Sequence, residues 1–254
     1  MTPPILAVDI GNTRIQLGRT TRLAGDGHPE WDRMQFRDTV SFQPESLEAE
    51  LPSEPLVWRV ASVQRSAERL LAEWVTRARP SDRYQRLSHA DLPLRIDVQQ
   101  PGRVGMDRLV AAVAANRLRQ PPRAAIVIDA GTAVTVDALA FDGTFLGGVI
   151  LPGMRMTVRA LAAGTDLLPL VDVAFSDAVP PVIGRSTEAA IRSGAFWGTV
   201  GGIRHFVARF ADEIGHDAEV FVTGGDAGYL AQLIGSGARC EPYLVLNGIV
   251  WSGL

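Results

Sequence analysis

The chain has 254 residues, with 25 basic and 28 acidic side chains and a formal net charge of −3. All 25 basic residues are arginine, so the chain lacks the lysine on which P-loop nucleotide hydrolysis, protein-kinase catalysis and Schiff-base chemistry depend. The mild acidity argues against a nucleic-acid or anionic-membrane partner, and the single cysteine, Cys240, excludes an internal disulfide and is expected to be a small buried residue.

The N-terminus has no basic leader and reaches Asp9 after a short apolar run, so no signal peptide is expected. No apolar stretch approaches the roughly 18 residues that a membrane span requires. We therefore expect a soluble, cytoplasmic protein.

Two segments of the chain show the same pattern. Residues 5–8 form a short apolar run that ends in Asp-Ile-Gly-Asn-Thr and continues as an alternating run over residues 14–18. Residues 125–128 end in Asp-Ala-Gly-Thr-Ala and continue as residues 134–139. Each pattern predicts a β-hairpin with a tight glycine turn. The spacing of 120 residues indicates two related units that account for most of the chain.

Between the hairpins, the sequence predicts a buried strand at residues 56–63 and helices at residues 66–79 and 106–118. Pro121-Pro122 interrupts the chain, which sets a domain boundary within residues 117–123 and predicts domains 1–118 and 119–254. Residues 22–54 are polar and show no clear periodicity, so their structure stays open.

The second half predicts further alternation of strands and helices. The expected strands are residues 145–151 and 220–222, and the expected helices are residues 156–163, 188–214 and 227–234. Glycines along residues 188–214 indicate an interior or interface helix. The fold class is therefore α/β with some antiparallel pairing.

The paired turns are the strongest candidates for chemistry. Successive backbone N–H groups at a tight glycine turn can bind phosphate, with help from the hydroxyls of Thr13 and Thr132. The carboxylates of Asp9 and Asp129 could hold a cation that bridges those phosphates. A single such turn is more simply an ordinary hairpin whose aspartate bonds its own backbone. Two copies favour binding, and Thr-Gly-Gly at residues 223–225 could allow close approach of a flat ligand.

A second candidate is Gly105-Met106-Asp107-Arg108, which opens a helix near the domain boundary and so beside an expected interdomain cleft. Asp107 could act as a general base for a hydroxyl, and Arg108 could bind a carboxylate or phosphate. An ordinary first-turn aspartate beside a surface arginine fits the spacing equally well. Thr187 lies in an expected helix cap, and the four scattered histidines show no zinc-ligand spacing.

These motifs resemble the type III pantothenate kinases, a family of the acetate and sugar kinase/Hsp70/actin superfamily. The matching segments are VDIGNT (8–13), GMDRLVAAVAAN (105–116), VIDAGTAVTVDAL (127–139), FLGGVILPGM (145–154), GRST (184–187) and VTGGDA (222–227). The resemblance implies two related ribonuclease-H-like (actin-like ATPase) domains around an interdomain cleft. It also implies ATP-dependent phosphorylation of the primary hydroxyl of pantothenate, the first step of coenzyme A biosynthesis, by a homodimer.

The resemblance also implies roles for individual residues. Asp107 would be the general base, while Asp9 would lie near Mg²⁺ and Asp129 would bind a monovalent cation, K⁺ or NH₄⁺. The implied ATP contacts are Asp9, Ile10, Gly11, Asn12, Thr13, Arg14, Ile15, Gln16 and Thr132. The implied pantothenate contacts are Gly105, Met106, Asp107, Arg108 and Thr187. Family members often carry a tyrosine seven residues before the glycine of GxDR, where this chain has Val98.

Apart from a structural actin-like filament protein, which would be expected to be longer and to polymerise with nucleotide, two alternatives remain beside this expectation. One is another small-molecule kinase or phosphatase of the same superfamily, and the intact GMDR segment argues against it. The other is a non-catalytic regulatory relative. Such a protein would have no physical reason to keep Asp9, Asp107 and Asp129 together.

Overall fold

The computed structural model describes residues 3–24, 27–120, 123–173, 179–235 and 237–253. The chain forms two compact units, the first from Met1–Arg117 with Tyr243–Leu254 and the second from Leu118–Pro242. The sequence-based division assigned all of residues 119–254 to the second domain, whereas the C-terminal segment belongs to the first. Each unit is built around one five-stranded sheet.

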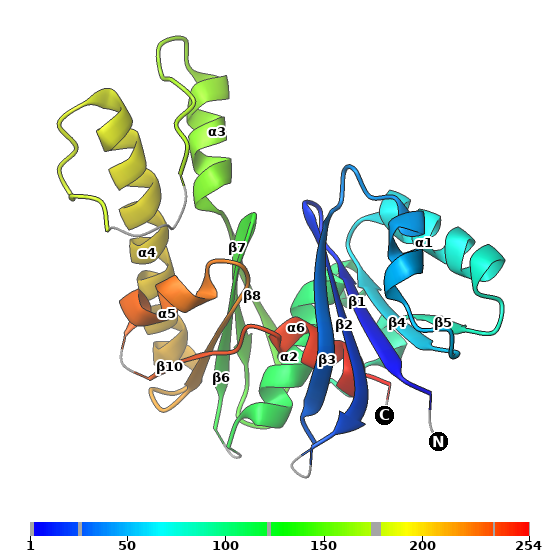
Figure 1. The fold of residues 1–254 in the computed structure, drawn as a ribbon. Coiled ribbons are helices and arrows are strands. Elements are labelled where there is room, and N and C mark those ends of the chain that lie inside the picture. The colour runs from blue at the N-terminus through cyan, green and yellow to red at the C-terminus, as the bar shows by residue number, and fades with distance from the viewer. Residues whose placement is uncertain (1–2, 25–26, 121–122, 174–178, 236, 254) are drawn as a thin grey trace. The chain divides into compact units, whose positions relative to one another are not determined.

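The first sheet has the order β3-β2-β1-β4-β5 (Figure 1). Its strands are β1 (Ile5–Ile10), β2 (Arg14–Leu23), β3 (Pro29–Asp38), β4 (Val57–Ser62) and β5 (Arg83–Arg86). The first three strands pair antiparallel, and β4 and β5 continue the sheet parallel to β1. The carboxyl ends of β1, β4 and β5 therefore meet at one edge.

The second sheet repeats this arrangement, with the order β10-β9-β6-β7-β8. Its strands are β6 (Ala125–Ala130), β7 (Ala133–Leu139), β8 (Phe145–Pro152), β9 (Glu219–Thr223) and β10 (Ala238–Cys240). Again three antiparallel strands are followed by two parallel ones. This is the ribonuclease-H-like topology in both units, so the predicted α/β class and internal duplication are confirmed.

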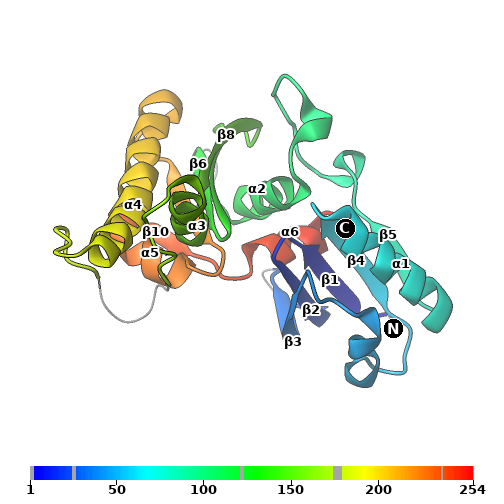
Figure 2. The same ribbon diagram turned by 90° about the horizontal axis from the view of Figure 1, so that it is seen from above.

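Helices cover both faces of the first sheet, as Figure 2 shows for α1 (Arg65–Ala78) and α6 (Leu244–Trp251). One face of β1 carries Leu6, Val8 and Ile10, which pack with α1 and with the 3₁₀ helix η1 (Pro44–Glu50). Because side chains alternate along a strand, Ala7 points to the other face, where α6 lies against β1.

The C-terminal helix explains the difference in the domain boundary. Every residue of α6 is buried, so the helix needs apolar neighbours on all sides. Buried Arg59 of β4 donates hydrogen bonds to the carbonyl oxygens of Val250 and Gly253 at the end of this helix. Gly248 packs directly on the backbone of Val110 in α2 (Met106–Leu118). These contacts make α6 part of the first core.

Three helices complete the second unit. They are α3 (Met154–Gly164), α4 (Thr187–Ile214) and α5 (Ala227–Ile234). Ile128 of β6 and Val136 of β7 share a core with Ile203 of α4 and Leu230 of α5. No helix among the described residues is long and apolar enough to cross a membrane.

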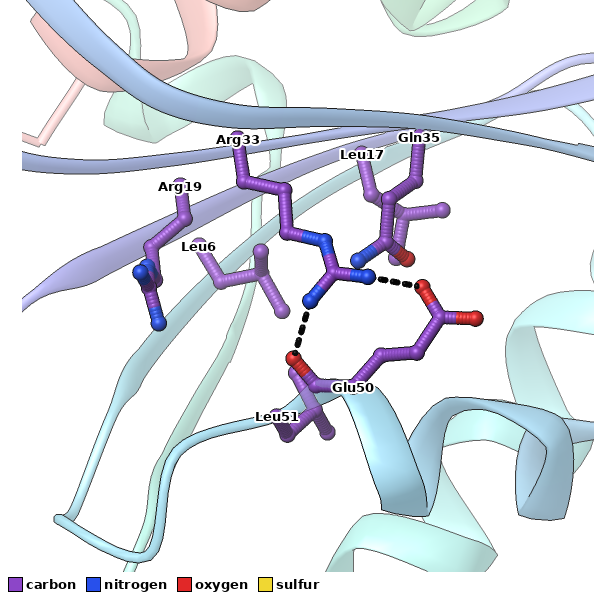
Figure 3. Close-up of a pocket in the computed structure, with 7 residues that line it drawn as sticks. All are labelled: Leu6, Leu17, Arg19, Arg33, Gln35, Glu50 and Leu51. Atoms are coloured by element: carbon purple, nitrogen blue, oxygen red, sulfur yellow. Dashed lines mark hydrogen bonds and ion pairs between the residues drawn. The ribbon is translucent and has the colours of Figure 1, made fainter.

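The structure also settles the segment that the sequence left open. Residues 22–24 and 27–54 contain the end of β2, all of β3 and η1, and Glu50 of η1 forms ion pairs with Arg33 and Arg37 of β3. Arg33 of β3 donates to the Glu50 carboxylate at 2.9 Å and to its backbone carbonyl at 3.1 Å, beside a small pocket (Figure 3). Cys240, expected to be buried, is exposed at the end of the edge strand β10.

Candidate active site

The first predicted turn joins β1 to β2. Asp9 pairs with Gln16 and Ile10 with Ile15, and the Gly11 N–H donates to the Arg14 carbonyl at 3.0 Å. This leaves Asn12 and Thr13 exposed at the tip. Asp9 is half-buried, with its Oδ1 atom out of contact with solvent. The predicted hairpin is therefore present, and its polar residues lie at the edge formed by the carboxyl ends of the parallel strands.

The Gly105–Arg108 segment starts α2 in the same unit. The Asp107 Oδ1 atom accepts the backbone N–H of Arg108 at 2.8 Å, and the Leu109 N–H donates to the Gly105 carbonyl at 3.3 Å. Burial raises the pKa of the Asp107 carboxyl above its ordinary value, although the Arg108 N–H and guanidinium act in the opposite direction. A carboxylate held in this way is a stronger base than a solvated one.

The loop after β4 connects this segment to the first turn. The Val63 N–H donates to the Ile10 carbonyl at 3.0 Å, and its side chain lies 3.6 Å from the position that a Cβ would take at Gly105. The turn after Asp9 and the start of α2 therefore meet at one edge of the first sheet. Ligands of open α/β sheets bind at such carboxyl-terminal edges.

His89, which the sequence did not single out for a role, supports the same segment. It begins the short 3₁₀ helix η2 (His89–Asp91) after β5, and its Nε2 atom lies 3.2 Å from the Val104 carbonyl oxygen. A carbonyl only accepts, so Nε2 carries the proton in this pair. His89 thereby anchors the residue that precedes Gly105.

The second turn joins β6 to β7 and is one residue shorter than the first. The Gly131 N–H donates to the Ala133 carbonyl at 3.1 Å, which leaves the exposed Thr132 alone at the tip. Thr13 and Thr132 each precede the residue whose carbonyl closes the turn. The two threonines are thus equivalent in position. They are 119 residues apart, whereas Asp9 and Asp129 are 120 residues apart, because the second turn is one residue shorter.

The Thr-Gly-Gly segment after β9 lies directly beside Asp129. Gly224 has a φ of +95°, and a Cβ at this position would be 2.5 Å from the Asp129 Oδ1 atom. The Asp226 N–H donates to the Ala130 carbonyl at 3.1 Å. Glycine thus lets the backbone after β9 pass in close contact with the Asp129 carboxylate and the Ala130 carbonyl group.

Thr187 occupies a separate part of the second unit. It is the exposed first residue of α4, whose cap is Ser186, with its hydroxyl accepting the Ala189 N–H at 3.2 Å. Among the described residues, no hydrogen bond joins Thr187 to the turn at Asp129. The helix cap that the sequence predicted in this segment is therefore confirmed. A ligand contact by Thr187 stays a prediction.

The described parts of the two units contain no preformed cluster of metal ligands. Within the described residues, no group of three or more His, Cys, Asp or Glu side chains is placed to hold a metal ion. Asp9 and Asp129 belong to different units, and each ends the first strand of its sheet. A single carboxylate suits Mg²⁺ that is held largely by the phosphates of a nucleotide.

Gly105 offers a test of the Asp107 geometry. We expect Gly105→Ala to lower turnover about ten- to a hundredfold, because the new methyl group would stand 2.5 Å from Asp107 Oδ1 and displace the carboxylate. Gly102→Ala is the matched control, because nothing lies within 4 Å of its Cβ position. Steady-state turnover of both variants gives the comparison. Equal turnover in the two would show that the position of the carboxylate does not matter.

A family model described as type III pantothenate kinase matches residues 5–209. The chain belongs to the type III pantothenate kinase family. A relative of that name from Rhodopirellula baltica is 36% identical over 272 residues, covering 96% of this chain and 97% of the relative. Another, from Moorella thermoacetica, is 32% identical over 265 residues and covers 96% of each chain. The expectation drawn from the sequence motifs is confirmed at the level of the family.

A solved structure extends the comparison to the fold. A Campylobacter jejuni protein assigned to the Baf family of transcriptional activators matches 97% of this chain and 96% of its own, with a TM-score of 0.60. At 19% identity this likeness supports the fold alone. Both units of the chain therefore have the ribonuclease-H-like arrangement that the strand order showed.

Proposed function

We propose that the protein transfers the γ-phosphoryl group of ATP to the primary hydroxyl of pantothenate, which gives 4′-phosphopantothenate in the first step of coenzyme A biosynthesis. The half-buried Asp107 carboxyl with its raised pKa, at the start of α2 in a chain of this family, carries the proposal. The names of the relatives, type III pantothenate kinase, support the choice of substrate.

Asp107 is the proposed general base. As the hydroxyl oxygen bonds to the γ-phosphorus and the bond to the leaving ADP oxygen breaks, its carboxylate accepts the hydroxyl proton. The bond from the Arg108 N–H at 2.8 Å fixes the orientation of the carboxylate. The Arg108 guanidinium binds the carboxylate of pantothenate, and Gly105 and Met106 line the acceptor, while Thr187 makes a further substrate contact in this proposal.

The phosphates of ATP are proposed to meet the two glycine turns. In the first unit this involves the residues from Asp9 to Gln16, and in the second unit Thr132. Backbone N–H groups at tight turns attract anions and replace the missing lysine. The transfer then depends on positioning and charge neutralisation, which supply most of the catalysis in phosphoryl transfer.

Two cations complete the proposal. Asp9 would hold Mg²⁺ together with the phosphates, and Asp129 would hold K⁺ or NH₄⁺ beside the backbone of Gly224. When bound, these ions neutralise phosphate charge. The protein itself contributes one carboxylate for each ion, Asp9 at the end of β1 and Asp129 at the end of β6.

We also propose that the protein acts as a homodimer through α4. The long helix has glycines at 194, 198 and 201, and no described atom lies within 4 Å of the Cβ position of any of them. A glycine face that contacts no other described part of the chain fits a closely packed partner helix. Light scattering of the purified protein tests this, with a dimer expected and a monomer contradicting it.

A substrate panel tests the proposed function. ADP release is measured with pantothenate, with a hexose and with acetate, first in potassium and then in sodium buffer. We expect release only with pantothenate, and in the potassium buffer but not in the sodium buffer. Release with a sugar or acetate would support another kinase of the superfamily. ATP binding without any turnover would support a regulatory relative.

A further inference from the structure

Thr39, the residue that follows β3, holds two carbonyl groups of the first turn. Its backbone N–H donates to the Thr13 carbonyl at 3.0 Å, and its hydroxyl donates to the Gly11 carbonyl at 2.9 Å. The side chain is almost fully buried, with 5% of the residue exposed. One residue, which directly follows β3, thus determines where two of the turn's carbonyl oxygens point.

The direction of these carbonyls decides what the turn presents to a ligand. In a trans peptide the C=O and N–H of one unit point in opposite directions. The Gly11 carbonyl shares its peptide unit with the Asn12 N–H, and the Thr13 carbonyl shares its unit with the Arg14 N–H. Both N–H groups therefore point away from Thr39. A phosphate is attracted by such N–H groups and repelled by carbonyl oxygens.

Polar contacts hold the residues on both sides of Thr39 in place. Two residues earlier, Arg37 forms an ion pair with Glu50 of η1 at 2.6 Å, next to the Arg33–Glu50 pair of Figure 3. The preceding residue, Asp38, accepts the Val40 and Ser41 N–H groups at 3.0 and 2.9 Å. The chain is thus held by an ion pair before Thr39 and by hydrogen bonds to the two residues after it. Because its own position is fixed in this way, Thr39 can restrain the turn.

The second unit has a bond at the equivalent place. The Gly153 N–H, directly after β8, donates to the Thr132 carbonyl at 3.1 Å. A Cβ at this glycine would lie 2.6 Å from the Thr132 oxygen and closer still to the Gly131 oxygen, so no side chain fits there. Both units therefore restrain their turn from the end of the third strand. The first unit differs from the second in one respect, the hydrogen bond that the Thr39 hydroxyl donates to the Gly11 carbonyl.

We propose that Thr39 is a positioning residue for nucleotide binding, whose two hydrogen bonds hold the turn from Gly11 to Arg14 with its N–H groups toward the phosphates of ATP. This inference rests on the proposed function, because it takes the turn to be the phosphate site. Thr39 itself does not touch the ligand. Its effect passes through the conformation of the turn.

Thr39→Val tests the hydroxyl bond, because valine keeps the shape of the side chain and the backbone bond. We expect the Kd for MgATP and the KM for ATP to rise about five- to tenfold, the effect of losing one buried hydrogen bond. The KM for pantothenate should stay within about twofold. Thr39→Ser keeps the hydroxyl and should restore ATP binding. Thr39→Ala provides a second hydroxyl-free variant if the valine variant folds poorly.

Thr20→Val is the matched control. Thr20 is also buried in the first sheet, and its hydroxyl donates to the Arg22 carbonyl at 2.7 Å, far along β2 from the turn. Unchanged ATP binding in Thr39→Val, or equal weakening in Thr20→Val, would overturn the proposal. MgATP binding is measured by calorimetry without pantothenate. If wild-type protein binds ATP but does not phosphorylate pantothenate, the calorimetry still decides the role of Thr39 separately.

Discussion

Replacing Asp107 with asparagine is expected to lower turnover about 10²- to 10⁴-fold, the usual contribution of a general base. Asparagine has nearly the same shape and can still accept the Arg108 N–H through its amide oxygen. MgATP and pantothenate should therefore bind almost as in the wild-type protein. Steady-state kinetics and calorimetry on the same preparations separate the two effects.

The pH dependence of the wild-type enzyme should follow the same group. A general base works in its deprotonated form, and burial raises the pKa of Asp107. The value of kcat/KM should therefore increase as the pH rises through this raised pKa and then level off. Asp107→Asn should lose this limb of the profile. An exposed carboxylate of β3 gives the control, since Asp32→Asn should leave both turnover and profile unchanged.

Asp107→Asn should also change stability, in the direction opposite to its effect on turnover. Because the folded-state pKa is raised from the ordinary 3.8, the stability from the protonated carboxyl is complete below that value and is lost as the pH rises through the folded pKa. At neutral pH the wild-type protein thus buries an unfavourable charge that the variant lacks. We expect a Tm for the variant at or above the wild-type value at pH 7, with the difference shrinking toward pH 4. A lower Tm at pH 7 would contradict the burial of this charge.

Gly248→Ala is expected to destabilise the protein by about 3 kcal/mol or more, at the upper end of overpacking effects. The new methyl group would overlap the backbone carbonyl of Val110, so the crossing of α6 and α2 must open. A backbone atom cannot rotate aside as the end of a side chain can. Because Asp107 lies in the first turn of α2, turnover should fall as well. Urea unfolding followed by circular dichroism measures the loss.

Gly228→Ala is the control for this prediction. Gly228 lies in α5, and nothing is within 4 Å of its Cβ position. Alanine there should be neutral or stabilise the protein by up to about 1 kcal/mol, since it favours a helix more than glycine does. If Gly248→Ala were as stable as Gly228→Ala, the close packing of α6 on α2 could not be as described.

The elements that the sequence predicted are those with a strong internal pattern. Helix α2 was predicted at its observed bounds, and the two hairpins were predicted from their apolar runs and glycine turns. Strand β3 was not, because it is an edge strand of the sheet and its residues are mostly exposed or half-buried. The edge strands β5 and β10, of four and three residues, are too short to show a period.

The domain assignment of the C-terminus could not come from local sequence. Helix α6 is apolar on every side, so its pattern says that it is buried but not in which unit. Its place depends on partners almost 200 residues away, such as Arg59, which bonds the Val250 and Gly253 carbonyls. Only the three-dimensional structure supplies those contacts.

The candidate site likewise contains some residues that could be identified from the sequence and others that could not. Residues with a chemical signature, such as Asp107 and the turn glycines, could be named from the sequence. Thr39, His89 and Gly153 could not, because each acts through hydrogen bonds to carbonyl groups in other segments of the chain, two such bonds for Thr39 and one each for His89 and Gly153. A threonine after a polar strand carries no local sign of that bond. Its partner is set by the register of β2 and β3.

The identity of the product tests the central claim most directly. Pantothenate is incubated with the protein, MgATP and potassium, and the product is examined by ³¹P NMR. We predict a new phosphomonoester signal, split by the two protons of the adjacent methylene group, which places the phosphate on the primary hydroxyl. A phosphorus signal split by a single proton, or only free phosphate and ADP, would contradict the account.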